Sequence, residues 1–406
     1  MSQATRSRPP RTAPDGVAGG SGRRAQVLEA AAVAFGRRGY AAVGLGDIAA
    51  AVGISAPALY RHFPGKYALF AEVAQVEMAT LVAAADAVPD TDDPRAVLHA
   101  IATTTLAHRA HGSLYRWEAR FLEPDDREQL RATTRRLRAA VSVPLRRRRP
   151  ELDERDAAFL AAAALAVIAS VGVHRVVTPD LADLVTGLAL GALATSLPPA
   201  PVSRLDAAPV TTPPWQVGLE ATSKRERLVT EAVKAFERHG YLGATLEEIG
   251  GAVGLTASAV YRYVPTKAAL LAAAFARTQV QLSAVTSAAL AEATSADEAV
   301  DALASAYVLL WFQQPQVMSV WGSEAGHLGD DERDELRAAQ RDHVEVWVRV
   351  TQARSPGLDP VAARLRVHAA LTVVADTGRL LRFDRRPEVR ARVVAVVRSL
   401  LLAPGP

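Results

Sequence analysis

The fold is decided by a stretch that occurs twice in the chain. The first copy reads RRAQVLEAAAVAFGRRGY at residues 23–40 and LGDIAAAVGISAPALYRHFPGKYALF at residues 45–70. The second copy reads KRERLVTEAVKAFERHGY at residues 224–241 and LEEIGGAVGLTASAVYRYVPTKAALL at residues 246–271, in register and 201 positions later. A repeat period of this size indicates two whole domains and not a solenoid.

Each copy has the pattern of three short helices. In the first copy, apolar residues recur at helical spacing from Val27 to Phe35, and Gly39 ends that pattern. A second short helix is expected at residues 45–52, with Gly53 forming the turn that follows it. Ser55 is then the natural N-cap of a third helix that we expect to run to Phe63. A supporting helix, a glycine turn and a short third helix are typical of a helix-turn-helix unit, which inserts its third helix into the major groove of DNA.

Positive charge is concentrated on the repeated units. Residues 1–70 hold nine Arg and Lys against three acidic residues, and residues 222–270 hold seven against five. This distribution suits contacts with phosphate. In each copy a lysine begins the next helix, where its ammonium and the free N–H groups of the helix N-terminus would bind a phosphate together.

Several positions of both copies together resemble the TetR family of bacterial repressors. In the first copy they are Phe35, Gly39-Tyr40, Ile48, Val52-Gly53, Leu59-Tyr60, Phe63-Pro64, Lys66 and Leu69; in the second they are Phe236, Gly240-Tyr241, Thr245, Ile249, Val253-Gly254, Tyr261, Pro265, Lys267 and Leu270. The resemblance implies an all-α protein of two tandem halves, packed as an intramolecular pseudo-dimer. Each half would join a DNA-binding headpiece to a helical bundle that binds a small molecule and releases the operator. The tandem arrangement resembles an actinobacterial branch of the family that is associated with lipid or sterol uptake genes.

The same resemblance assigns DNA-contact positions residue by residue. They are Ser55, Ala56, Pro57, Tyr60, Arg61, His62 and Lys66 in the first copy, and Thr256, Ala257, Ser258, Tyr261, Arg262, Tyr263 and Lys267 in the second. The two recognition segments differ, SAPALYRH against TASAVYRY. We therefore expect an operator that is not a clean palindrome, with half-site centres one or more helical turns (~34–36 Å) apart.

Composition supports the helical class and excludes several others. Half of the residues are apolar but only 5% are aromatic, which favours helices over strands. The chain has no cysteine, so disulfides and thiolate metal sites are excluded and a reducing cytoplasm fits. Residues 157–173 are the longest apolar run, which we interpret as a bundle helix and not a membrane span.

The order of segments predicts six regions. These are a disordered basic tail (1–22), the first DNA-binding headpiece (23–70), a helical ligand-binding and pseudo-dimerisation domain (71–197), a Pro-rich linker (198–222), the second headpiece (223–271) and a second helical domain (272–406). The stretches 118–131 and 324–337 also resemble each other, so we expect two complete halves and not merely two headpieces.

Candidates for an effector pocket are large or charged residues in otherwise Ala-rich bundles. They are Trp117, Glu118, Phe121 and His174 in the first half, and Trp311, Trp321, Glu324 and Arg379 in the second. Core packing is the alternative reading of these side chains. The sequence contains no metal-ligand pattern, phosphate loop or catalytic constellation, so we expect neither a cofactor nor an enzyme.

We therefore expect a cytoplasmic transcriptional regulator, a repressor released by a small-molecule effector that is lipid-like or acyl in character. Double-stranded operator DNA and this effector are its expected partners, with no membrane. The two halves can pair within one chain, so we expect a monomer, with a homodimer as the alternative. The alternative function is a lipid- or small-molecule-binding helical protein whose headpieces have lost DNA affinity.

Overall fold

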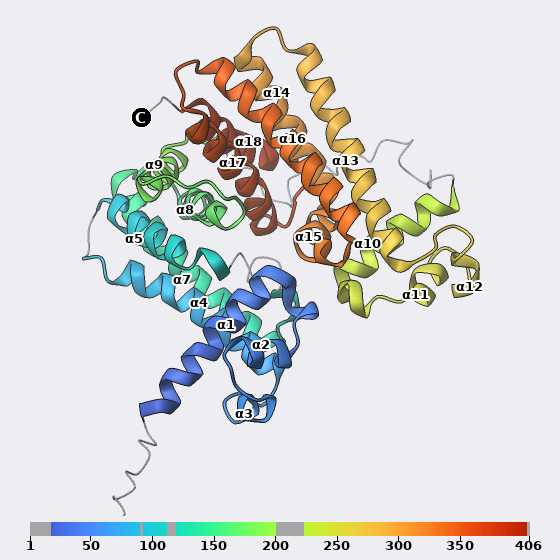
Figure 1. Cartoon of the computed structure of the whole chain (residues 1–406). Helices are drawn as coiled ribbons and strands as arrows, with labels where there is room; N and C mark the ends of the chain where they lie inside the picture. The colour runs from blue at the N-terminus through green and yellow to red at the C-terminus, as the bar shows by residue number, and fades with distance from the viewer. Residues whose placement is uncertain (1–17, 90–91, 112–118, 200–222, 404–406) are drawn as a thin grey trace, which may run out of the picture.

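The computed structural model describes residues 18–89, 92–111, 119–199 and 223–403, and every regular element within these ranges is helical. The expected basic tail, apart from residues 18–22, and nearly all of the expected linker lie outside the described residues. The helices form two halves side by side, coloured blue to green and yellow to red (Figure 1). The predicted all-α class with two tandem halves is confirmed.

The first headpiece consists of α1 (Ala18–Ala42), α2 (Leu45–Ala51) and α3 (Ala56–Tyr60). The backbone of α1 leaves the helical conformation at Gly39, where φ is 77°, a left-handed value that suits glycine. α3 is shorter than expected. After Tyr60 the chain makes a tight turn in which the N–H groups of His62 and Phe63 both donate to the Leu59 carbonyl. Pro64 then prevents the helix from continuing.

The second headpiece repeats this arrangement with α10 (Lys224–Gly243), α11 (Leu246–Gly251) and α12 (Ala257–Val260). Gly240 breaks α10 with a φ of 69°, as Gly39 breaks α1. The turns before the recognition helices have the same backbone in both halves, with φ values of 66° at Gly53 and 73° at Gly254. The matching glycines of the two copies therefore have the same left-handed backbone conformation.

A capping box has two hydrogen bonds, and the second helix of each headpiece begins with a different one of them. Thr245 Oγ1 accepts a hydrogen bond from the Glu248 N–H at 3.1 Å, while the Glu248 carboxylate pairs with Arg238 at 2.8 Å. In the first headpiece Gly44 has no side chain to cap α2, and its own N–H donates to the Asp47 carboxylate at 3.1 Å. Each helix start satisfies one backbone donor, so neither has a full capping box.

In the described part of the first body there are five α-helices and three short 3-10 turns. In chain order these are α4 (Lys66–Asp86), α5 (Pro94–Ala107), η1 (Arg109–His111), η2 (Ala119–Phe121), α7 (Pro124–Arg148), α8 (Glu154–Ala169), η3 (Ser170–Gly172) and α9 (Leu181–Leu193). The body of the second half contains α13 (Lys267–Glu292), α14 (Ala296–Gln313), α15 (Pro315–Glu324), η5 (Ala325–His327), α16 (Asp330–Arg354), α17 (Pro360–Leu380) and α18 (Pro387–Leu402).

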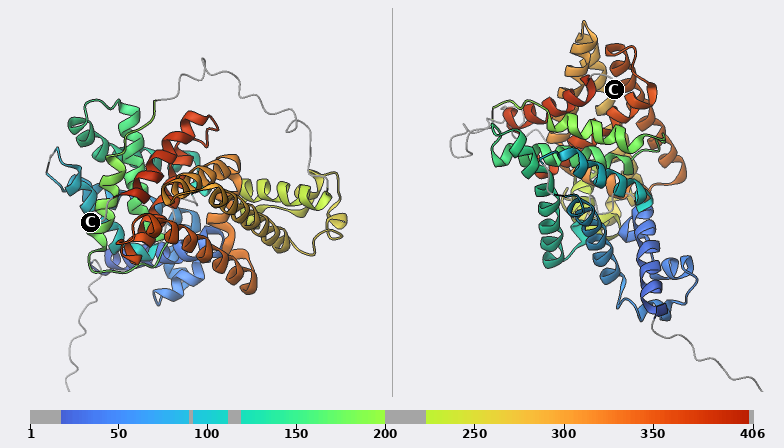
Figure 2. Two further views of the ribbon diagram at one scale, coloured as in Figure 1. Left: turned by 90° about the horizontal axis from the view of Figure 1, so that it is seen from above. Right: turned by 90° about the vertical axis from the view of Figure 1, so that its left-hand side faces the viewer.

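The two halves meet through α8 and α9 of the first and α17 and α18 of the second (Figures 1 and 2). Arg392 of α18 is buried there, forms an ion pair with Asp156 of α8 and donates to the Pro198 carbonyl at 2.9 Å. Its guanidinium also lies 5.6 Å from the centre of the Phe159 ring. These four helices are thus packed against each other between the halves, and the expected pseudo-dimer forms within one chain.

Where the chain is described, three helices are long and apolar enough to cross a membrane by length and composition alone. They are Lys66–Asp86, Glu154–Gly172 and Lys267–Glu292. In this structure α8 lies at the centre of the contact between the halves, and α4 and α13 connect each headpiece to its body.

Candidate nucleic-acid interface

Each recognition helix buries one face and exposes another. Leu59 and Phe63 are completely or almost completely buried in the first headpiece, and Val260 and Val264 take the same places in the second. The apolar residues therefore hold the recognition helix against its headpiece and leave the opposite face to solvent.

The proposed base-reading residues lie at the exposed start of the recognition helices. Ser55, Ala56 and Pro57 are all exposed, and Ser55 Oγ accepts from the Ala58 N–H at 3.3 Å, so its hydroxyl caps the helix. In the second headpiece Thr256 and Ser258 are exposed and Ala257 is half-buried; Thr256 caps α12 through the Ala259 N–H at 3.3 Å. Small residues at a helix start let the backbone come close to base edges.

The residues at the end of the recognition helices also face solvent. Tyr60 is 55% exposed and Tyr261 57% exposed, an unusual exposure for tyrosines that served only as core packing. Arg61 and Arg262 are exposed, and within the described residues neither forms an ion pair. His62 is half-buried whereas Tyr263 is exposed, so the two surfaces differ most at this position.

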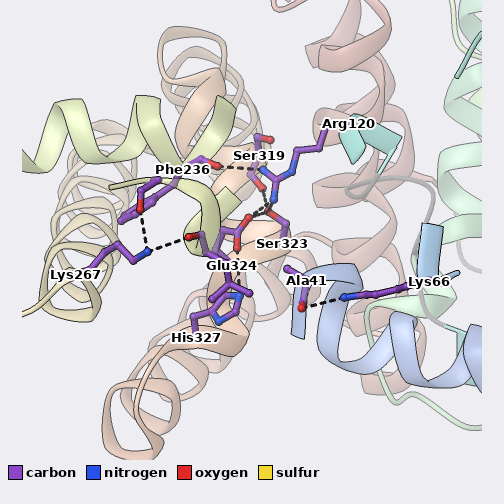
Figure 3. A network of polar contacts seen from close by, with 11 residues as sticks. Ala41, Lys66, Arg120, Phe236, Lys267, Ser319, Ser323, Glu324 and His327 are labelled. Carbon is purple, nitrogen blue, oxygen red and sulfur yellow. Dashed lines mark hydrogen bonds and ion pairs between the residues drawn. The ribbon is translucent and has the colours of Figure 1, made fainter. Parts of the chain in front are cut away.

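The two matched lysines lie differently from what the sequence suggests. Lys66 Nζ donates to the Ala41 carbonyl at 3.2 Å and lies 4.5 Å from the centre of the Tyr40 ring. Lys267 Nζ donates to the Ala244 carbonyl at 2.9 Å (Figure 3). It also lies 4.6 Å from the centre of the Tyr241 ring. Both ammonium groups therefore bind the C-terminal end of the first headpiece helix, and their contact with phosphate stays a prediction.

Two of the four candidate pocket residues of the first half are described, and they lie in different surroundings. Trp117 and Glu118 lie outside the described residues. Phe121 packs on Tyr40, with ring centres 5.4 Å apart, and its ring edge would be 3.1 Å from a Cβ atom at Gly240 of the other half. His174 is 7% exposed and lies beside His368 of the other half, with ring centres 4.9 Å apart.

The candidates of the second half occupy three separate places. Trp311 and Trp321 belong to an aromatic core that also contains Phe275, Tyr307 and Trp347. Arg379 pairs with Asp376 on its own helix at 2.6 Å. Trp311 is buried and Trp321 is half-buried in this cluster, and Arg379 lies at the end of α17.

Glu324 is the centre of a polar network between the halves. It is 2% exposed and forms an ion pair with Arg120 of η2, which also donates to Ser323 Oγ at 2.8 Å and approaches the Phe236 carbonyl at 3.5 Å (Figure 3). Arg120 thus links the body of the first half to the headpiece of the second. Sequence reasoning missed Arg120, although Gly326 stands at the matching position of the similar stretch 324–337, and this difference between the halves was a usable signal.

A cavity of about 250 Å³ lies under the first headpiece, between α1, α4, α5 and the η1 and η3 turns. Its wall is mainly apolar, and it also contains the carboxylates of Glu29 and Glu77 and the imidazole of His111. None of the described pocket candidates lines this cavity. No sequence signal could have indicated it, because its walls come from helices that are far apart in the chain.

His111 joins three elements at this cavity. Its ring is 4% exposed, donates from Nε2 to the Glu29 carboxylate of α1 at 2.7 Å, and forms a second ion pair with Glu77 of α4. The hydrogen bond with Glu77 raises the pKa of His111 to about 9, with burial opposing and Glu29 adding to the rise. A protonated His111 therefore ties the headpiece helix to the body.

Comparison with known proteins identifies the repeated unit. The family model described as "Bacterial regulatory proteins, tetR family" matches residues 27–73 and again residues 228–274. The chain is 33% identical over 118 residues to the HTH-type transcriptional repressor KstR2 of Rhodococcus jostii, which is 28% of this chain and 58% of that protein. It is 45% identical over 60 residues to the HTH-type transcriptional activator FasR of Mycolicibacterium smegmatis, which is 15% of this chain and 27% of that protein.

Among solved structures, the TetR family regulator PfmR from Thermus thermophilus is similar with 26% identity and a TM-score of 0.37. The alignment covers 41% of this chain and 96% of that one. The chain spans 58% of the length of the first of these curated relatives and 27% of the length of the second. With two matched units and two helical halves, the chain belongs to the TetR family of bacterial regulatory proteins, as a member that carries two TetR-type helix-turn-helix units in tandem.

Proposed function

We propose that the chain is a cytoplasmic, sequence-specific DNA-binding transcriptional regulator that works as a single-chain pseudo-dimer. The observation that carries this proposal is the presence of two exposed recognition faces of different sequence on halves that are packed together through α8, α9, α17 and α18. One molecule then offers the two reading heads that a helix-turn-helix dimer offers.

The contacts with DNA divide into two kinds. Small residues at the helix starts, Ser55 to Pro57 and Thr256 to Ser258, would approach base edges and carry the sequence preference. The exposed Tyr60, Arg61 and their counterparts Tyr261 and Arg262 would contact phosphates and hold the protein in register. The ring of Tyr263, exposed where His62 is half-buried, would give the second half a contact that the first half lacks.

A salt-dependent gel shift with promoter fragments from upstream of the gene and its neighbours tests this proposal. We expect binding that weakens steeply with salt, because phosphate contacts release counterions. The variant with Arg61→Ala and Arg262→Ala should bind far less, while Arg349→Ala, an exposed arginine on α16, should bind as the original protein does. Failure to bind any fragment at low salt would favour the alternative, a ligand-binding protein with headpieces that no longer bind DNA.

The operator should be asymmetric. In a selection from random duplexes, the chain should enrich two different half-sites, because SAPALYRH and TASAVYRY present different side chains to the groove. A headpiece exchange that replaces 55–62 by the sequence of 256–263 should shift the preference toward a symmetric site. Enrichment of a palindrome by the unchanged protein would contradict the proposal.

We infer that the effector binds in the first half, in the cavity under the headpiece. The cavity touches both α1 of the headpiece and α4 and α5 of the body, so a ligand there can alter the angle between them. Its mainly apolar wall suits a compact lipid-like or acyl group, and the core of the second half is occupied by the cluster around Trp311. A coupling of about 1–3 kcal/mol would be enough to release the operator and make the protein a ligand-relieved repressor.

A cavity-filling substitution tests the effector site. Val76 lines the cavity and is 44% exposed, so Val76→Trp can enter it with little disturbance of the core. DNA binding should persist, while release by short-chain acyl compounds should weaken at least about tenfold. Val280→Trp, at a 69% exposed position of α13 in the other half, is the matched control. If both substitutions changed release by acyl compounds equally, the cavity would not be the effector site.

The pseudo-dimer makes one chain sufficient. The helices that would otherwise pair two subunits are buried between the halves, and Arg392 and Asp156 pair across this contact. We therefore expect a monomer of 43.0 kDa by light scattering, both free and on DNA. Twice this mass would imply four headpieces and a different operator.

A further inference from the structure

A groove of about 880 Å³ lies where the two halves meet, away from the cavity under the first headpiece. One wall is the segment from Val173 to Val177 of the first half, which joins η3 to α9. The other wall is formed by α16 and the start of α17 of the second half. The groove therefore exists only because the halves are packed together.

The charged side chains that line this groove are all cationic. Arg175 comes from the first half, and Arg337, Arg341 and Arg364 come from the second; none of the lining residues is acidic. Arg337 and Arg364 each have an acidic neighbour, Asp334 at 3.2 Å and Glu345 at 2.6 Å. Within the described residues Arg175 and Arg341 have no such neighbour, and both are exposed. Two cations on opposite walls are thus available to an anion.

Apolar surface lies between these cations. Val173 is 48% exposed, Val177 81% and Val361 39%, and all three line the groove. Large apolar side chains with such exposure next to arginines are typical of a surface that binds an amphiphilic molecule and not a purely polar one.

A buried donor without an acceptor lies in the same wall. His174 Nδ1 accepts from Arg109 Nη2 and from the Val176 N–H, each at 3.2 Å, so Nδ1 carries no proton. Burial and the neighbouring His368 and Arg109 lower the pKa of His174 to about 3, so the ring is neutral and its proton is on Nε2. This Nε2 is buried and has no hydrogen-bond partner among the described residues. A buried N–H without an acceptor is costly, and an oxygen of a ligand would satisfy it.

We propose that this groove is a second ligand site, which binds a small anionic amphiphile by its phosphate or carboxylate head and its alkyl chain. The anionic head lies between Arg175 and Arg341, near His174 Nε2. The alkyl chain covers Val173, Val177 and Val361. Because the two arginines belong to different halves, the bound anion bridges the halves and stabilises their packing. This site is separate from the proposed effector cavity and does not depend on DNA binding.

Calorimetric titration of the full chain tests the site directly. Octyl phosphate, octanoate, octanol and inorganic phosphate are the four probes, so that the head and the chain are tested separately. We expect octyl phosphate or octanoate to bind with at least about tenfold higher affinity than either octanol or inorganic phosphate. The better of the two amphiphiles identifies the head group.

Three variants place the binding in the groove. Arg175→Gln with Arg341→Gln removes the two available cations, and Val177→Asp puts a negative charge at an 81% exposed position that can tolerate it. Each should lower the affinity for the amphiphile at least about tenfold. Arg349→Gln, at an exposed position of α16 outside the groove, should leave it unchanged.

The amphiphile should also raise the thermal unfolding temperature of the original protein and not that of the double arginine variant. Equal binding of octanol, unchanged binding to the variants, or no binding of either amphiphile would overturn the proposal. Loss of promoter binding in the arginine variant without any effect on the amphiphile would instead make the groove a DNA contact. If the groove binds only the amphiphile, all of these variants should still bind the promoter. The test of the groove is then independent of the test of the headpieces.

Discussion

His111 shows how one side chain can link a headpiece to its body. The ring is buried between Glu77 of α4 and Glu29 of α1, and only its protonated form can donate to both carboxylates. Glu77 is the more buried of the two partners, with 15% of its side chain exposed against 63% for Glu29, so Glu77 should dominate the interaction.

The pH dependence of stability follows from this arrangement. The pKa of His111 is raised from 6.5 to about 9 in the folded chain. Its contribution is therefore fully present below about pH 6.5 and is lost as the pH rises toward 9 and above. We expect the free energy of unfolding in urea to fall by on the order of 2 kcal/mol over this window.

Glu77→Gln should flatten this pH dependence, whereas Glu29→Gln, at the exposed partner, should change it less. If the Glu77→Gln variant kept the same slope of unfolding free energy against pH between pH 6.5 and 9.5, His111 would not be the cause of the pH dependence.

Arg61 and Arg262 permit a comparison of the two headpieces. Both are exposed at the end of a recognition helix and lack an ion pair within the described part of the chain. Each alanine substitution should weaken binding to all duplexes about equally and reduce the slope of log affinity against log salt by about one. Titration by fluorescence anisotropy at three salt concentrations measures this. A loss confined to one operator sequence would instead assign the arginine to a base.

Gly240 and Gly254 of the second headpiece both have a left-handed backbone, but their surroundings differ. Gly240 has a φ of 69°, and a Cβ atom there would lie 3.1 Å from the Phe121 ring of the other half. Gly254 has a similar φ of 73° and open space around it. Alanine substitutions at these two glycines therefore distinguish the cost of backbone strain from the cost of disturbing the contact between the halves.

Gly254→Ala should therefore cost only the strain, about 1–2 kcal/mol in the free energy of unfolding. Gly240→Ala should cost more, because the Phe121 ring must also move away from the second headpiece. Urea denaturation of both variants gives the difference. Equal losses would mean that Phe121 adjusts freely and that η2 does not hold the second headpiece.

The polar network of Arg120 and Glu324 connects the halves at the level of the complete chain. Glu324 is 2% exposed and Arg120 has 17% of its side chain exposed, so loss of the arginine leaves a buried carboxylate without its cation. Arg120→Gln should lower the free energy of unfolding by about 3 kcal/mol. The double variant with Glu324→Gln should lose less than the sum of the two single variants.

The same variant should affect DNA binding in a particular way. Arg120 contacts the second headpiece through the Phe236 carbonyl and the body of the second half through Ser323 and Glu324, so its loss should loosen that headpiece relative to the first body. Affinity for a duplex that engages both headpieces should fall, while affinity for a single half-site should not. Equal losses on both duplexes would show that the network stabilises the fold without setting the separation of the heads.

Much of this protein can be predicted from local patterns in the sequence. The repeat, the glycine turns and the N-cap at Ser55 depend on neighbours within a few positions, and the structure confirms the elements they indicate. The buried and exposed faces of the recognition helices follow from spacing as well, since Leu59 and Phe63 are four residues apart. α3 ends at Tyr60, earlier than the predicted end at Phe63, because the residues after Tyr60 form a tight turn on the Leu59 carbonyl.

The sequence by itself determined the family, the helical class and which side chains of the headpieces face solvent, since these depend on short-range periodicity. Only the tertiary structure decided where Lys66 and Lys267 bind, that Trp311 and Trp321 lie in one aromatic cluster, and that Arg120, His111 and His174 are junctions between elements. The physical reason is that burial, ion pairing and the cavities arise where helices far apart in the chain pack together, and no spacing within one helix specifies its distant partner.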